Sequence, residues 1–227
     1  MNSSVRVSFL SLLLIALGFL GLAGRSAELT TAQVARVTGR HFQVGVDKTS
    51  GQVVELIDVA SQHNFASAAT NLGGLWELDL ANAGTLTPAN ARQFDVAPST
   101  ASALRLRWSE FGLVRAPQLN VEVTVRVDPN QALSHWQIQV NHTGGPPPRL
   151  IRFPRLLNIP EQPREHLAVP VWLGQQAENP RALLRGENSA PKRWEWSYPG
   201  LLSMQCLALT SDGGMGFGPT KTPRALP

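Results

Sequence analysis

Residues 119–143 constrain the fold of this chain more than any other stretch. From Val121 to Val127 every second residue is a valine and the residues between are polar. This period of two is typical of a strand with one buried and one solvated face. Turn-forming residues begin at Asp128, and the alternation then resumes with Trp136, Ile138 and Val140. The stretch predicts a long β-hairpin, and because a lone hairpin is marginal in water, its apolar face should cover another sheet.

Similar short patterns recur along the chain, with turn signals between them and almost no helical periodicity. They predict further strands at 41–47, 53–58, 75–80, 92–96, 104–108, 168–174 and 201–210. Residues 28–36 are interpreted as a polar lead, so the domain should open with a hairpin formed by 41–47 and 53–58. Many strands without helices indicate an all-β fold, predicted here as a large antiparallel β-sandwich.

The composition fits one large folded domain. The chain has 227 residues, of which 43% are hydrophobic and only 16% are charged, which excludes disorder throughout. The formal net charge is +4, and the basic residues that give this excess are scattered among prolines. They are not gathered into a basic stripe, so no nucleic-acid partner is expected. Thirteen of the 17 prolines lie from residue 146 onward. Because proline cannot donate to a β-ladder, this half should consist of edge strands and long loops.

Residues 1–26 have the layout of a secretory signal peptide. A short, positively charged start precedes the almost wholly apolar run 7–23, and small residues suited to cleavage follow. The alternative is a retained membrane anchor, but a run of about 17 residues is at the short end for spanning a bilayer. We therefore expect cleavage and export to the periplasm or beyond, with no stable membrane span afterwards.

Cysteine and histidine usage argues against several kinds of site. Cys206 is the single cysteine, so no intrachain disulfide can form, and its strand-like surroundings suggest a buried, inert thiol. The five histidines show no His-x-His or His-x-x-x-His spacing, so no metal or other cofactor is predicted. His135 and His142 are an odd number of residues apart, so on one strand they would face opposite sides. They would not form the converging pair that a sugar epimerase needs.

Glycoside hydrolysis needs two carboxyl groups that face each other across about 5–10 Å. Glu77 and Asp79 flank Leu78, so both should point to the same side of one strand. A solvated sheet face accounts for this pair without any catalytic role. No catalytic residue is therefore predicted.

An aromatic row near the C-terminus is the candidate binding site. Trp194, Trp196 and Tyr198 alternate, so an extended chain would present three rings on one face, with Arg193 and Glu195 on the other. Flat aromatic rings suit the apolar faces of sugars, and the two charged residues could supply polar contacts. These five residues are the predicted carbohydrate contacts. The alternative is that the row packs against the sandwich or a neighbouring domain, because large aromatics carry much of core and interface burial.

Several segments together resemble one known architecture. They are the opening hairpin, Leu75-Trp76-Glu77-Leu78, the valine-rich strand with its continuation from Trp136, and the stretch that begins Tyr198-Pro199-Gly200. This pattern resembles the N-terminal galactose-mutarotase-like super-sandwich of certain large bacterial glycoside hydrolases, over roughly residues 35–217. The resemblance implies that the sandwich supports a catalytic (β/α)-barrel or helps to shape its cleft, and that the catalytic carboxylates belong to the barrel.

We expect the chain to depart from that pattern by being truncated before the catalytic barrel. Residues 27–217 are expected to form the sandwich, whether or not it is complete, and 218–227 an unstructured tail that resembles an out-of-frame peptide. We expect a non-catalytic part of a carbohydrate-active enzyme. One alternative is a stand-alone carbohydrate-binding module that uses the aromatic row. Another is a small epimerase of the aldose-mutarotase kind.

Overall fold

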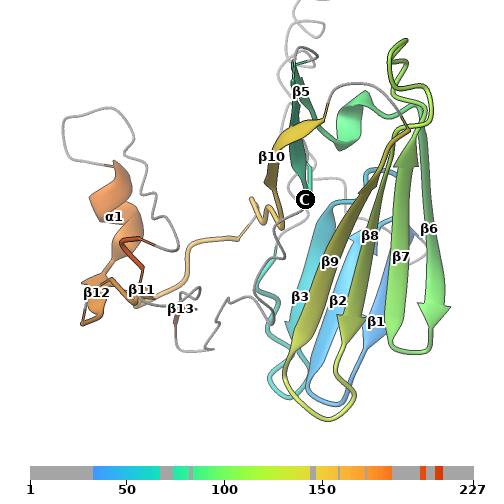
Figure 1. The fold of residues 1–227 in the computed structure, drawn as a ribbon. Helices are drawn as coiled ribbons and strands as arrows, with labels where there is room; N and C mark the ends of the chain where they lie inside the picture. The colour runs from blue at the N-terminus through green and yellow to red at the C-terminus, as the bar shows by residue number, and fades with distance from the viewer. Residues whose placement is uncertain are drawn as a thin grey trace, which may run out of the picture.

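The computed structural model describes residues 33–66, 74–81, 84–143, 147–157, 159–171, 173–185, 200–202 and 208–211. These residues form an all-β structure with antiparallel sheets, and two of the sheets pack face to face as a sandwich (Figure 1). The predicted fold class is therefore confirmed. Within these ranges, no helix has the length and apolar character needed to cross a membrane.

The first layer of the sandwich is a three-stranded sheet with the order β1-β2-β3. Its strands are β1 (Val34–Thr38), β2 (Phe42–Asp47) and β3 (Val53–Asp58). The turn between β2 and β3 contains Gly51 at a φ of 71°, a conformation that glycine adopts without strain. The predicted hairpin is confirmed, but the expectation of a polar lead over 28–36 is wrong where it overlaps β1. The buried residues Val34 and Val37 are three apart, so β1 lacks the period of two that identifies a half-buried strand in the sequence.

The second layer has the order β6-β7-β8-β9. Its strands are β6 (Gln93–Thr100), β7 (Ala103–Ser109), β8 (Asn120–Val127) and β9 (Ser134–Asn141). The predicted central hairpin is the β8–β9 pair, in which each β8 valine from Val121 to Val125 faces an apolar residue of β9. The carboxylate of Asp128 accepts hydrogen bonds from the backbone N–H groups of the following turn at 2.8 and 2.9 Å. β6 runs beyond its predicted end, because pairing with β7 extends it past Pro98.

The two layers enclose a continuous apolar core. β1 lies against β6, β7 and β8, and β2 lies against β8. All four β8 valines are fully buried, and Trp76 and Trp108 meet edge to face with ring centroids 5.8 Å apart. Phe94 stacks on Trp108 at 4.9 Å, above the turn that contains Gly51. The alternating valines thus cover a second sheet, as the isolated pattern required.

A smaller sheet lies at one end of the sandwich, with the order β10-β4-β5. It joins β4 (Glu77–Leu80) to β5 (Gly84–Leu86) and to the distant β10 (Pro148–Arg152), and the 3₁₀ turn η2 (Pro88–Asn90) follows β5. The inward residues Leu78 and Leu80 belong to the main core. β10 is an edge strand of this sheet, which agrees with the expectation for the proline-rich half.

The C-terminal unit consists of one small sheet and one short helix. The sheet has the order β12-β11-β13, with β11 (His166–Val169), β12 (Gln175–Glu178) and β13 (Ala208–Thr210), and the helix is α1 (Pro180–Arg185). Figure 1 shows this unit to one side of the sandwich, joined to it by the segment that follows β10. The strand predicted over 168–174 is instead the end of β11 and a turn, in which Gly174 has a φ of 96°.

Candidate functional site

The predicted carbohydrate contacts Arg193, Trp194, Glu195, Trp196 and Tyr198 lie outside the described residues. Cys206, the signal peptide 1–26 and the tail 218–227 also lie outside them. The predictions made for these segments therefore stay predictions. What the structure does place are the carboxylates and histidines on which an acid–base site would depend.

Glu77 lies between two arginines. As predicted, Glu77 and Asp79 share one face of β4, because the residues that alternate with them are buried. Arg152 faces Glu77 across the β4–β10 ladder and forms an ion pair with it. Arg155 Nη1 lies 3.4 Å from Glu77 Oε2. The backbone N–H of Arg155 also donates to Leu75 at 2.8 Å. Glu77 thus fastens β10 and the following residues to β4 across 75 positions of sequence.

Glu55 performs a similar role on the outer face of the first layer. Its side chain crosses over Gly45 and accepts hydrogen bonds from Arg36 at 2.6 and 2.8 Å and from Gln43 at 2.9 Å. The hydrogen bond to Glu55 raises the pKa of Arg36, against the opposing effect of burial. The pair ties β1 to β3 across β2, so it serves the sheet and not a reaction.

Glu165 and Arg181 form the most enclosed ion pair among the described residues, and the side chain of Glu165 is only 4% exposed. It accepts two hydrogen bonds from Arg181, at 2.5 and 2.9 Å, and one from the backbone N–H of Gln162 at 3.0 Å. Arg181 also donates to the carbonyl oxygens of Ile159 and Pro160. This arrangement holds α1 against the loop that precedes β11, again as a structural support.

Three aspartates stabilise turns in the same way. For Asp47, burial acts to raise the pKa, but hydrogen bonds from Ser50 and Thr49 outweigh it and the pKa is lowered. Hydrogen bonds from Ser61 and the backbone of Ala60 lower the pKa of Asp58. A hydrogen bond from the Asn130 backbone is the main cause that lowers the pKa of Asp128. Each carboxylate is therefore held ionised, whereas a general acid needs a pKa raised toward the working pH.

The tertiary structure brings the backbones of two histidines to the end of β3, a juxtaposition that the sequence analysis missed. The backbone N–H of Asp58 donates to the carbonyl of His63 at 3.0 Å. The next residue, Val59, donates to the carbonyl of His41 at 3.0 Å, so both histidines flank the end of β3. The ring of His63 lies edge-on against Phe65, and its Nε2 is buried without a hydrogen-bond partner. The pairing of Phe42 with Asp58 produces this arrangement, and hairpin register was its only sequence signal.

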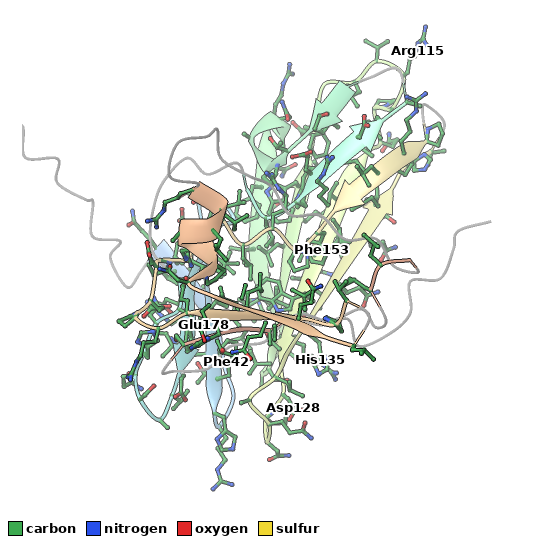
Figure 2. All side chains as sticks on the ribbon, turned by 90° about the vertical axis from the view of Figure 1, so that its left-hand side faces the viewer. Phe42, Arg115, Asp128, His135, Phe153 and Glu178 are labelled. Atoms are coloured by element: carbon green, nitrogen blue, oxygen red, sulfur yellow. The ribbon has the colours of Figure 1, made fainter. Side chains whose placement is uncertain are left out.

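This histidine group does not have the electrostatics of an epimerase site. Asp58 uses its two carboxylate oxygens to accept from Ala60 and Ser61 within its own turn, at 3.1 and 2.7 Å. His135 and His142 stay apart as predicted, because His135 is at the start of β9 and His142 follows its end. Acid–base work on a sugar would need a base and an acid aimed at one bound molecule. Asp58 instead binds within its own turn, and His135 lies at the end of the sandwich that carries Asp128 (Figure 2).

Two further findings bear on function. Within the part of the chain that the structure describes, no three His, Cys, Asp or Glu residues are grouped closely enough to hold a metal ion. The chain matches no protein-family model, and no curated protein matches it.

Proposed function

We propose that this chain is the exported, non-catalytic N-terminal sandwich of a carbohydrate-active enzyme of the glycoside-hydrolase type. In this role the sandwich supports a catalytic barrel or contacts polysaccharide beside it, and it has no hydrolase activity of its own. The proposed relationship is to galactose-mutarotase-like super-sandwich domains. The apolar leader over 7–23 supports export.

The observation that carries the proposal is the way in which the resembling segments come together. The opening hairpin β2–β3, strand β4 and the hairpin β8–β9 all contribute buried residues to one core. Val44, Leu78 and Val123 represent the three segments, and each is fully buried. A fold likeness does not transfer a reaction, so the proposal assigns the chain a supporting role and no catalytic residue.

The non-catalytic part of the proposal is supported by the state of the carboxylates. Glu55, Glu77 and Glu165 are each bound by arginine, and the three turn aspartates have lowered pKa values. A retaining or inverting glycosidase needs one carboxyl group that stays protonated to act as the acid. None of these six described carboxylates is placed to do so.

The test compares the purified chain with a Trp196→Ala variant. We expect no cleavage of chromogenic glycosides and no change of optical rotation with galactose or glucose. Calorimetric titration against a panel of polysaccharides measures binding, and thermal unfolding measures stability, with Val114→Ala as a control because Val114 is 95% exposed.

The two measurements separate the two supporting roles. If Trp196→Ala lowers stability while no polysaccharide binds, the aromatic row is a seam to another domain. If the variant loses binding at unchanged stability, the row contacts sugar. Unaided cleavage of a glycoside by the wild-type chain would refute the proposal.

A further inference from the structure

Strand β9 is a long edge of the sandwich that no strand covers within the described residues. It pairs with β8 on one side along all eight of its residues, and the order β6-β7-β8-β9 ends there. No backbone hydrogen bond links its outer side to any described segment. In Figure 1, β9 is the margin of its sheet on the side of the C-terminal unit, but it belongs to a separate sheet from β11, β12 and β13. Such an edge presents a row of unpaired N–H and C=O groups.

The opposite edge of the same sheet carries the protections that β9 lacks. β6 contains Pro98, an irregularity in register beside it, and the charged residue Asp95. Proline, charge and bulges are the usual means by which natural sheets prevent pairing with another chain. The β9 sequence Ser-His-Trp-Gln-Ile-Gln-Val-Asn has no proline, lysine or acidic residue, and its register with β8 is unbroken.

The side chains of β9 also indicate what would fit beside it. Trp136, Ile138 and Val140 point to the core side, and their β8 partners are fully buried, but these three are only partly buried. The indole N–H of Trp136 donates to Ser134 Oγ at 2.8 Å, so its polar atom is satisfied within the strand. On the outer face, Gln137 and Gln139 are exposed.

We propose that the free edge of β9 binds a β-strand from a different protein. The partner strand is extended and carries no charge, with bulky apolar residues at alternate positions and amide or hydroxyl residues between them. Its apolar row would cover the half-exposed side chains of β9, and its backbone would satisfy the unpaired edge groups. This inference does not depend on the proposed role in carbohydrate chemistry.

The sequence of β9 itself satisfies these requirements and supplies a probe. In an antiparallel pair centred on Ile138, Trp136 would face Val140 of the added strand and Gln137 would face Gln139. Every apolar residue would then lie on the core side and every glutamine on the outer side. The probe is a capped, dye-labelled peptide of the sequence of residues 134–141, with two lysines added at one end to keep it monomeric.

The experiment measures fluorescence anisotropy of the peptide titrated with the full chain. We expect saturable binding of the β9 peptide and at least tenfold weaker binding of a peptide of the same composition whose apolar residues are contiguous. A Gln137→Lys/Gln139→Lys variant of the chain tests the register. It should bind a peptide with glutamate at both glutamine positions about tenfold more tightly than one with lysine there, because like charges directly opposite each other are unfavourable. The wild-type chain should hardly distinguish these two charged peptides.

A matched control places two lysines on the protected edge, in the variant Gln93→Lys/Ser99→Lys, which should bind the β9 peptide as the wild type does. Circular dichroism and thermal unfolding check that both double variants stay folded. Absence of saturable binding would overturn the proposal. Light scattering should show a monomer, and a dimer that the Gln137→Lys/Gln139→Lys variant disrupts would overturn the proposal in favour of a second copy. Binding that is insensitive to the charges at 137 and 139 would overturn it as well.

Discussion

The sandwich and the C-terminal unit are built on opposite physical principles. In the sandwich, eleven large side chains that include the four β8 valines have less than 2% of their surface exposed. In the C-terminal unit the strands are short, β12 is mostly exposed, and the buried charge of Glu165 organises the loop and α1. Burial of apolar area is non-directional and its stabilisation is spread over many contacts, whereas one enclosed ion pair depends on every partner being present. The two regions should therefore respond differently to the same kind of damage.

The largest expected effect comes from truncation in the sandwich core. Trp108→Ala should reduce the free energy of unfolding by about 3–5 kcal/mol, because the indole packs against Trp76, Phe94 and the Gly51 turn. Urea unfolding followed by far-UV circular dichroism measures the loss. The exposed substitution Val114→Ala is the control and should stay within about 0.5 kcal/mol of the wild type. A loss below about 1 kcal/mol for Trp108→Ala would contradict the packing described here.

The second effect should be confined to the C-terminal unit. Glu165→Gln leaves Arg181 without its ionic partner, and we expect local stability to fall by about 2–3 kcal/mol. Hydrogen exchange resolved by mass spectrometry should show faster exchange in β11 and α1 and no change in β8. The control is Arg185→Gln, since the pair of Arg185 with Glu161 is exposed and should contribute less than about 1 kcal/mol. Equal acceleration in β8 would mean that the two regions unfold as one.

A smaller effect tests the ion pair on the sandwich surface. A Cβ on Gly45 would lie 2.8 Å from Cβ of Glu55, so Gly45→Ala should displace that side chain and cost about 1–2 kcal/mol. A double-mutant cycle with Glu55→Ala measures how much of the cost passes through the Arg36–Glu55 pair. If the two substitutions are additive, Gly45 is not required for the path of Glu55.

The smallest effect concerns acid. The pKa of Asp47 is lowered in the folded chain, so its stabilising contribution is complete above its ordinary pKa of 3.8 and is lost as the pH falls through the folded value. Asp47→Asn should therefore lose less stability than the wild type as the pH is lowered below 3.8, where protonation of Asp47 removes its contribution. Urea midpoints at several pH values measure this difference. The control is Asp95→Asn, because Asp95 is at an exposed position of β6. If the two variants lose the same amount of stability in acid, the hydrogen bonds of the Asp47 turn are not the cause.

Some of this architecture follows directly from local sequence. The β8 valines, the turn at Asp128 and the return through Trp136 specify a hairpin, because alternation and turn chemistry are local properties. The shared face of Glu77 and Asp79 follows from the same rule. β1 was missed because its buried residues are three apart, and the extension of β6 past Pro98 depends on its neighbour β7.

The candidate sites were harder to predict than the strands. Arg152 reaches Glu77 from 75 residues away, and the carbonyls of His41 and His63 bind consecutive backbone N–H groups at the end of β3. Spacing in the sequence gives no measure of such distances. The aromatic row from Trp194 to Tyr198 is a sequence prediction that awaits the measurements proposed above.

By itself, the sequence determined that this chain forms paired strands with one apolar face, because side-chain alternation is a property of each strand alone. The tertiary structure decided which carboxylates are bound by arginine, which histidines flank the end of β3 and which edge of the sandwich has no partner among the described residues. Those outcomes depend on contacts between residues far apart in the chain, and their energies arise only when the two layers pack.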